Sequence, residues 1–343
     1  MAQIELSKTN FFYNLSRLSQ LAGSTDRLMA VLKDNAYGHG LVQMAQMAAA
    51  YGIRSVAVRT NAEAAVVASL FEEVLILADR PAAALIDRCH YALNEMIHMK
   101  HFPPGTTVHL KVETGMNRNG VPAQEVTEAI GRLHAAGLKL GGVFSHLSGA
   151  DECDDSFARQ EACFDQVREG VIALCRENAL PRPLFHLYNS AALMRKDSDP
   201  SRYDRVRPGI ALYGYGDLPS QLGDRDLKPV LALWADRIAT RTLQKGDRVG
   251  YGGVFEAPET MQASTYDVGY GDGFLRLNGR EGYTIPEGKR VLGRVSMDNM
   301  SIEGEAERLC VLSDADYLAR LRGTISYEVL VRLAPGIERI ITD

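Results

Sequence analysis

Lys33 directly follows the apolar residues 28–32, and Tyr37 and two glycines come shortly after it. If the apolar run is a strand of a parallel α/β fold, its carboxyl end opens into the crevice where such folds bind ligands. There the lysine amine can react with a carbonyl cofactor, and the glycines let a flat ligand approach the backbone. The alternative is a surface lysine that ends a strand.

Two later segments carry the small residues and the hydroxyl group that suit a phosphate. Asn189 and Ser190 follow one probable strand, and Gly209 and Ile210 follow another. In a (β/α)8 barrel, the loops after the last two strands commonly bind phosphate through backbone N–H groups. Alternatively, Asn189 and Ser190 only begin a helix and residues 208–209 form a plain turn.

Lys111 and Arg118 lie on a probable strand and on the glycine-containing turn that follows it. The Arg118 guanidinium can hold a carboxylate with two parallel hydrogen bonds. Lys111 lies near the core, where a bare ammonium is unfavourable unless it is paired or modified. The alternative is an inward lysine whose stem reaches the barrel mouth.

His146 follows the apolar end of another expected strand, with Asp151 and Glu152 nearby. Such a histidine can carry a proton or orient a neighbouring group, although a structural histidine is the alternative. No second His or Cys lies at ligand spacing from it, so the sequence predicts no metal site.

Tyr270 lies in the loop DVGYGDG, whose glycines leave its ring exposed. As a phenolate it would be a strong base, and the alternative is a hairpin loop with an aromatic edge. The segment 292–298 follows, and it carries Arg294, Met297 and Asp298.

Short apolar runs alternate with helical patterns in the first two thirds of the chain. Ser7 can cap a helix that has Phe11, Leu15, Leu18 and Leu21 on one face. Continuously apolar strands between helices indicate a parallel sheet covered on both sides, and we predict a (β/α)8 barrel, with an open doubly wound sheet as the alternative. The expected strands are 28–32, 55–58, 74–77, 108–112 and 140–144, and the expected helices include 41–51, 62–71, 121–133 and 154–175.

The last third of the chain has a different pattern. Strand-like segments at 230–241, 262–268 and 289–295 are separated by turn signals without helical patterns between them. We therefore predict a barrel domain over residues 7–218 and a β-domain over residues 219–343, to which a strand at residues 1–6 is added.

Composition limits the class of protein. The formal net charge is −5, which argues against nucleic acid as a partner. The five cysteines are scattered and odd in number, which indicates a reduced, cytoplasmic chain. We see neither a signal peptide nor an apolar run of the ~20 residues that a membrane span requires.

Together these segments resemble the alanine racemases, PLP-dependent enzymes built from a (β/α)8 barrel and a β-domain. The similarity runs from Ala30 to about Arg332 and includes VLKDNAYGHG, KVETGMNRNG, FHLYNSAAL, VRPGIALYGY, VGYGDG, GRVSMD and ISYEVL, in this order. Any one motif is weak, but seven in order are specific.

The resemblance implies that Lys33 holds PLP (pyridoxal 5'-phosphate). Arg207 would face the ring nitrogen with support from His186. Because a guanidinium keeps its proton, the ring nitrogen would stay largely unprotonated and the cofactor would be a weaker electron sink. The other cofactor contacts that we predict are Tyr37, Asn189, Ser190, Gly209, Ile210 and Tyr327.

The resemblance also implies a base on each face of the substrate. Lys33 would serve the D-side proton, and Tyr270 of the neighbouring subunit in a homodimer would serve the L-side proton. Arg118 and the backbone of Met297 would hold the substrate carboxylate.

Several other residues have supporting roles by the same resemblance. His146 would hydrogen-bond the phenol, Asp298 would support the site, and Lys111 matches a position that is often carbamylated. Asp151 and Arg294 would line a narrow entryway together with Tyr270 and Tyr327.

We therefore predict a racemase that interconverts L-alanine and D-alanine and supplies D-alanine for peptidoglycan. A broad-specificity or serine racemase remains open, since the same bases would serve. Less favoured are a decarboxylase of the same fold type, which would use a catalytic cysteine, a non-catalytic PLP carrier, and a sugar-phosphate barrel enzyme.

Overall fold

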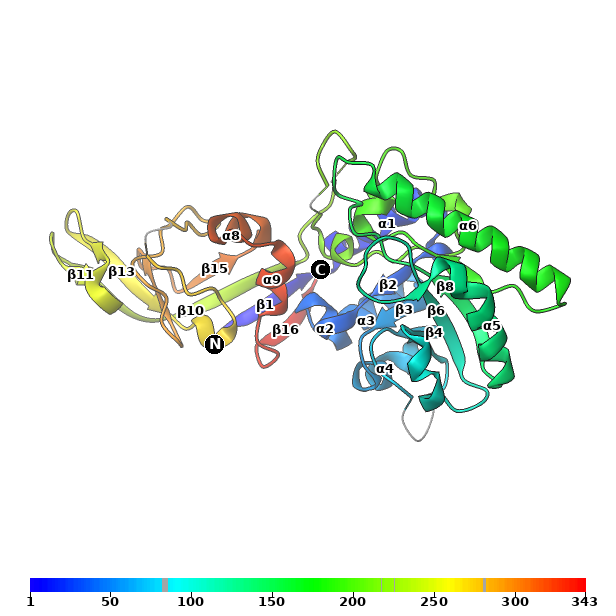
Figure 1. The fold of residues 1–343 in the computed structure, drawn as a ribbon. Coiled ribbons are helices and arrows are strands. Elements are labelled where there is room, and N and C mark those ends of the chain that lie inside the picture. Colours follow the sequence, from blue (N-terminus) through cyan, green and yellow to red (C-terminus); the bar gives the residue numbers. More distant parts are fainter. Residues whose placement is uncertain (82–85, 217, 225, 280–281) are drawn as a thin grey trace. The chain divides into compact units, whose positions relative to one another are not determined.

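Figure 1 shows the chain as a computed structural model, which describes residues 1–81, 86–216, 218–224, 226–279 and 282–343. The chain forms two compact units. The barrel unit comprises Phe11–Asp34 and Met44–Lys228, and the β unit comprises Met1–Asn10, Asn35–Gln43 and Pro229–Asp343. The domain boundaries at 218 and 219 stay a prediction.

A curled parallel sheet is the centre of the barrel unit. Its neighbouring strands, in order, are β2 (Met29–Val31), β3 (Ser55–Val58), β4 (Glu73–Ile76), β5 (Cys89–Leu93), β6 (Thr107–Glu113), β8 (Lys139–Phe144) and β9 (Leu184–His186). The short strand β7 (Val121–Pro122) also pairs with β6. Single parallel bridges join Arg205 to His186 and Val206 to Leu28, so residues 205–206 act as the eighth strand and close the ring. The predicted (β/α)8 barrel is thereby confirmed.

Helices cover the outside of this sheet, as α4, α5 and α6 show in Figure 1. The helices that begin or lie in this part of the chain are α1 (Lys8–Ala22), α3 (Leu41–Tyr51), α4 (Asn61–Val67), α5 (Val126–Ala135), α6 (Ser156–Glu177) and α7 (Ser190–Met194). The Ser7 hydroxyl accepts a hydrogen bond from the Asn10 N–H at 3.1 Å, which confirms the predicted cap of α1.

Three details of the sequence-based prediction are wrong. Leu21 is 40% exposed, because the buried stripe of α1 turns to Ala22 at its end. The helix predicted from residue 121 begins at Val126, because Val121 and Pro122 pair with β6 instead. Strand β5 was not predicted, because it begins with Cys89 and His90 and so lacks a continuous apolar run.

An antiparallel-rich sheet forms the β unit. Its strands run in the order β14 (Met300–Glu303), β13 (Met261–Tyr266), β10 (Leu231–Leu243), β1 (Gln3–Ser7) and β16 (Glu338–Thr342), and β15 (Arg308–Leu312) also pairs with β10. Strand β1 is antiparallel to β10 and parallel to β16. A separate small ribbon joins β11 (Arg248–Val249) and β12 (Phe255–Glu256).

The β unit is mostly β, as predicted, but two of its details differ. Helices α8 (Ala315–Arg322) and α9 (Ser326–Val331) interrupt the strands. The strand predicted at 289–295 is wrong, because only Arg290 and Val291 form isolated bridges there. Short 3-10 turns occur in the chain at Thr25–Arg27, Ala68–Leu70, Met96–His101, Ala123–Glu125, Pro200–Arg202, Ile210–Tyr213, Tyr251–Gly253 and Tyr270–Asp272. None of the described helices is long and apolar enough to cross a membrane.

Candidate active site

Lys33 begins a short helical turn, α2 (Lys33–Tyr37), which is left-handed. Asp34 to Tyr37 all have φ between +52° and +55°, and Gly38 follows at +82°. A left-handed turn costs roughly 1–2 kcal/mol for each residue with a Cβ, so it persists only where other contacts fix it. The predicted glycine-containing turn is confirmed, but its handedness was not predicted, because Ala36 and Tyr37 rarely adopt this conformation.

The first residue of the left-handed turn is fixed within the barrel unit. Arg59 donates a hydrogen bond from Nη1 to Oδ1 of Asp34 at 2.9 Å, and Lys33 Nζ lies 3.7 Å from Oδ2 of the same carboxylate. The lysine is therefore followed at once by an anchored carboxylate.

The rest of the turn is fixed within the β unit. The Asn35 side chain accepts a hydrogen bond from Leu41 N at 2.9 Å, and the Tyr37 ring lies 5.8 Å from the Tyr327 ring. The Gly38 carbonyl accepts two hydrogen bonds from the buried Arg339 guanidinium, at 3.1 and 2.9 Å. Two of the predicted phosphate ligands, Tyr37 and Tyr327, therefore lie side by side.

Ser190 lies at the centre of the other predicted phosphate contacts. Its hydroxyl oxygen accepts hydrogen bonds from Gly209 N at 2.9 Å and from Ala211 N at 3.2 Å. Asn189 caps α7 with its side-chain oxygen, 3.0 Å from Ala192 N, so the alternative role as a helix cap is present as well. Ile210 is buried and begins the 3-10 turn Ile210–Tyr213, which follows Gly209.

Ser190, Gly209 and Ile210, which we call the Ser190 cradle, lie next to β2, the strand that precedes Lys33. Val31 N, at the end of β2, donates a hydrogen bond to the Pro208 carbonyl at 3.0 Å, and the Tyr213 hydroxyl donates to the Val31 carbonyl at 2.9 Å. Neighbouring barrel strands thus place the lysine and the Ser190 cradle at the same end of the barrel.

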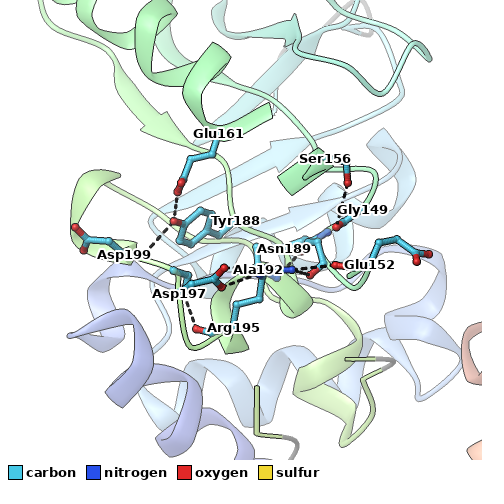
Figure 2. Close-up of polar contacts among 12 residues, drawn as sticks. Gly149, Glu152, Ser156, Glu161, Tyr188, Asn189, Ala192, Arg195, Asp197 and Asp199 are labelled. Carbon is cyan, nitrogen blue, oxygen red and sulfur yellow. Dashed lines mark hydrogen bonds and ion pairs between the residues drawn. The ribbon is translucent and has the colours of Figure 1, made fainter. Parts of the chain in front are cut away.

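A polar network holds the loop around residue 151 against the segment after Tyr188 (Figure 2). Arg195 donates to the carbonyls of Ala150 and Glu152 at 3.1 and 3.2 Å and forms two hydrogen bonds to Asp197. The Tyr188 hydroxyl donates to Glu161 on α6 and accepts from Asp199 N. Asp151, a predicted entryway residue, lies half-buried on the loop that this network fixes.

Arg207 is buried inside the barrel and donates four hydrogen bonds. Nη1 donates to Nδ1 and to the carbonyl oxygen of His186 at 2.8 and 2.7 Å, and Nη2 donates to the carbonyls of Ser145 and Leu187. A guanidinium has five N–H groups. The four hydrogen bonds use Nη1 and Nη2 and do not involve Nε. Burial lowers the pKa of Arg207 to about 9 and lowers that of His186 well below its usual range.

Lys111 is also buried, and its amine donates to the Asn119 side chain. Burial, with help from the cations of Arg118 and Arg207, lowers the pKa of Lys111 to about 8. Arg118 is exposed, on a turn that the Glu113 carboxylate fixes by accepting hydrogen bonds from Gly115 N and Arg118 N. His146 is half-buried, and desolvation together with the nearby cations lowers its pKa to about 3, so it is neutral.

In the β unit, Tyr270 and Met297 lie on two loops that are joined by backbone hydrogen bonds. Tyr270 N donates to Ser296 O at 3.0 Å, and Gly271 N donates to Met297 O at 2.8 Å. Tyr270 is 38% exposed and Met297 is 55% exposed, and Asp298 follows Met297 on the same exposed loop. A Cβ at position 269 would lie 2.1 Å from Met297 O, so the glycine permits this close approach. Arg294 is half-buried in the preceding segment.

Three residues of the barrel interior were not predicted from sequence. They are Glu73, His90 and His109. His109 is buried on β6 and lies between His186 on one side and His90 on the other. Glu73 on β4 lies beside both His90 and His109. A signal was present in the sequence, because His109 and Lys111 share one face of an otherwise apolar strand.

The sequence and the fold both match one family. The model "Alanine racemase, N-terminal domain" matches residues 6–217, and "Alanine racemase, C-terminal domain" matches residues 230–341.

Two relatives cover nearly all of the chain. An alanine racemase of Nitratiruptor sp. is 45% identical and covers 100% of both chains. An alanine racemase of Campylobacter jejuni is 41% identical over 99% of this chain and 100% of that protein. The crystal structure of alanine racemase from Bacillus anthracis with bound L-Ala-P is similar with a TM-score of 0.86 at 25% identity, over 100% of this chain and 95% of that one. The chain belongs to the alanine racemase family.

Proposed function

We propose that this protein is a PLP-dependent alanine racemase that interconverts L-alanine and D-alanine. The observation that carries the proposal is the hydrogen bond from Val31 N to Pro208 O. It supports the proposal because the lysine follows β2, and the Ser190 cradle follows the neighbouring strand, at the carboxyl ends where such barrels bind ligands. An amine and a group of phosphate donors at neighbouring strand ends are what a phosphorylated carbonyl cofactor requires.

The donor set fits PLP. Ser190, Gly209 and Ile210 would hold the phosphate with a hydroxyl and backbone N–H groups, joined by Tyr37 and Tyr327. The Nε–H of Arg207, which none of its four hydrogen bonds uses, would meet the ring nitrogen. Because the other four N–H groups are bound to fixed acceptors, Arg207 would keep its orientation and its proton. Bound PLP would withdraw electrons from the Cα–H bond of an attached amino acid and so make that proton removable.

Two bases on opposite faces of Cα are then required. Lys33 Nζ would move the proton on the D side. Tyr270 Oη of a second copy of the chain would move it on the L side, which makes the working enzyme a homodimer. Tyr270 suits this role because its loop is fixed by backbone hydrogen bonds while the residue itself is exposed.

The remaining polar residues would orient the substrate. The exposed Arg118 guanidinium would hold the carboxylate with Met297 N, and Glu113 fixes the backbone of the Arg118 turn. Neutral His146 would hydrogen-bond Tyr270, and Asp298 would support it. Asp151 and Arg294 would narrow the entryway and so favour small side chains.

Lys111 is proposed to be carbamylated. Its lowered pKa leaves part of the amine neutral and therefore nucleophilic toward CO2 near neutral pH. The carbamate would replace a buried cation by an anion, beside Arg118 and Arg207.

The competing functions are less well supported. A decarboxylase of the same fold type would need a reactive cysteine, whereas Cys310 is buried in β15 and burial raises the pKa of its thiol to about 11. A racemase that also accepts serine would use the same bases. Only substrate tests can therefore distinguish it from a strict alanine racemase. With alanine as substrate, the biological role would be supply of D-alanine for peptidoglycan in the cytoplasm.

The test is to incubate the purified protein with PLP and either L-alanine or L-serine and to follow the D-isomer by chiral chromatography. Borohydride reduction followed by peptide mapping locates the cofactor. We expect D-alanine as the main product and PLP on Lys33. Release of CO2 instead of the D-isomer, or PLP on another lysine, would contradict the proposal.

A further inference from the structure

At the opposite end of the barrel from Lys33, three side chains converge on one point. Glu73 begins β4, His90 is the second residue of β5, and His109 is the third residue of β6. Because these neighbouring strands are parallel, all three residues lie toward their amino-terminal ends. The group takes no part in the proposed racemase chemistry.

The facing atoms form a nearly equilateral triangle. Nδ1 of His90 lies 3.1 Å from Nε2 of His109, and Oε1 of Glu73 lies 3.6 Å from each of these nitrogens. For a tetrahedral zinc ion, bond lengths of about 2.0–2.2 Å place neighbouring ligand atoms about 3.3–3.5 Å apart. The observed separations of 3.1 and 3.6 Å lie on either side of this spacing, so one such ion fits after a small shift of the side chains.

A hydrogen bond explains the contact between His90 and His109, but it does not explain the position of Glu73 Oε1. A separation of 3.6 Å is too long for a hydrogen bond. In the described part of the chain, Oε1 of Glu73 is buried without any hydrogen-bond partner, although its other oxygen accepts from Ser55 Oγ at 3.4 Å. A buried carboxylate oxygen without a partner is unfavourable, and a cation in the triangle would satisfy it.

We infer that Glu73, His90 and His109 form a binding site for a tetrahedral divalent transition-metal ion such as Zn²⁺. Two imidazoles and one carboxylate are a ligand set that zinc uses. His90 is only half-buried, so solvent can reach the fourth coordination position, whereas His109 is fully buried. The ion would tie together three adjacent strands of the barrel.

The hydrogen bonds around the site are compatible with metal ligation, but metal binding would remove one of them. A metal on Nε2 of His109 leaves the ring proton on Nδ1, which lies 2.7 Å from Nε2 of His186. His186 would then carry its own proton on Nδ1, where Arg207 now donates. An occupied site therefore removes one of the two Nη1 hydrogen bonds of Arg207, and metal binding competes with that bond.

The test uses the full-length, PLP-loaded protein after treatment with a chelator. Zn²⁺ binding is measured by isothermal titration calorimetry, and Co²⁺ is added as a spectroscopic probe of geometry. We expect one site per chain, a tetrahedral Co²⁺ spectrum, and a rise in melting temperature with Zn²⁺. Glu73→Gln and His90→Gln should each weaken Zn²⁺ binding by at least about tenfold and abolish the rise in melting temperature.

Two histidines outside the triangle supply the controls. His98→Gln and His134→Gln should bind Zn²⁺ as the wild type does, since His134 is exposed and the half-buried His98 is paired with Arg80 and Glu95 instead. Melting curves without metal establish that each variant folds. The inference is overturned if no site is found, if binding survives in both Glu73→Gln and His90→Gln, or if it is lost in His98→Gln.

Discussion

Nη1 of Arg207 donates a hydrogen bond to Nδ1 of His186 across 2.8 Å, and both side chains are buried inside the barrel. The Arg207 guanidinium also lies 5.2 Å from the Phe144 ring, which stacks on the His186 ring. The orientation of the guanidinium is therefore fixed on several sides.

Arg207→Lys should reduce racemisation strongly. An ammonium cannot replace the planar set of donors, so two or more backbone carbonyls lose their partner. We expect kcat to fall about a hundredfold and the melting temperature to fall as well, measured by D-alanine formation and thermal denaturation. His186→Asn is the matched control, because the amide oxygen can accept in place of Nδ1 and should keep kcat within about tenfold. Equal losses in the two variants would contradict this role of Arg207.

Tyr270→Phe should separate cofactor binding from racemisation. The loop backbone that holds residue 270 does not depend on the hydroxyl group, so PLP content should be unchanged while racemisation falls about 10³-fold. Tyr251→Phe, at another exposed tyrosine of the β unit, should have no effect. Full activity of Tyr270→Phe would refute the two-base proposal, and Lys33→Ala should lose both PLP and activity.

Carbamylation of Lys111 should depend on pH. Burial lowers the pKa of the amine to about 8, so the reactive neutral form increases from pH 7 to pH 9. In ¹³C-bicarbonate, NMR should show one carbamate signal that grows over this range and is missing in Lys111→Ala. Exposed lysines such as Lys139 should stay unlabelled, and an unmodified Lys111 amine at pH 9 would end the proposal.

The same lowered pKa has a consequence for stability when CO2 is removed. The folded chain releases its Lys111 proton at about pH 8, whereas the unfolded chain keeps it to about pH 10.4. Because the unfolded state binds more protons between these values, this residue should make stability rise with pH across that window. Urea unfolding of wild type and Lys111→Met at pH 7 and pH 9.5 measures the effect, and a wild-type stability that does not rise relative to Lys111→Met would contradict it.

Gly38→Ala should destabilise the β unit more than Gly246→Ala, although both glycines have a positive φ. A Cβ at residue 38 would lie 2.0 Å from the Leu330 carbonyl, and φ is +82°. Gly246 has φ of +92° but open space around it, so Gly246→Ala should cost only about 1 kcal/mol. We expect Gly38→Ala to lose about 2–4 kcal/mol and to bind PLP less tightly, as followed by denaturant titration and cofactor absorbance. Equal effects of the two substitutions would show that the close approach to Leu330 is unimportant.

Much of the fold could be predicted from the sequence because its signals are local. Apolar runs such as Ser55–Val58 match the strand found there, and the pattern of Leu41–Tyr51 matches α3. Strand β5 has no such pattern and exists because neighbouring strands complete the ring, whereas the strand expected before Gly209 is present as the single bridges at residues 205–206.

The sequence by itself determined which residues are candidates for the chemistry: a lysine after an apolar run, a serine and glycines at later strand ends, and a tyrosine between glycines. Each of these is a choice of side chain in a local motif. Only the tertiary structure decided the left-handed turn after Lys33, since Ala36 and Tyr37 resist that conformation unless distant contacts such as Arg339 on Gly38 stabilise it.

Tertiary structure also decided what lies inside the barrel. Glu73, His90, His109 and His186 lie far apart along the chain and come together only because parallel strands close into a ring. The spacing of these residues in the sequence does not predict that their side chains meet, because the register between the strands decides which side chains lie together.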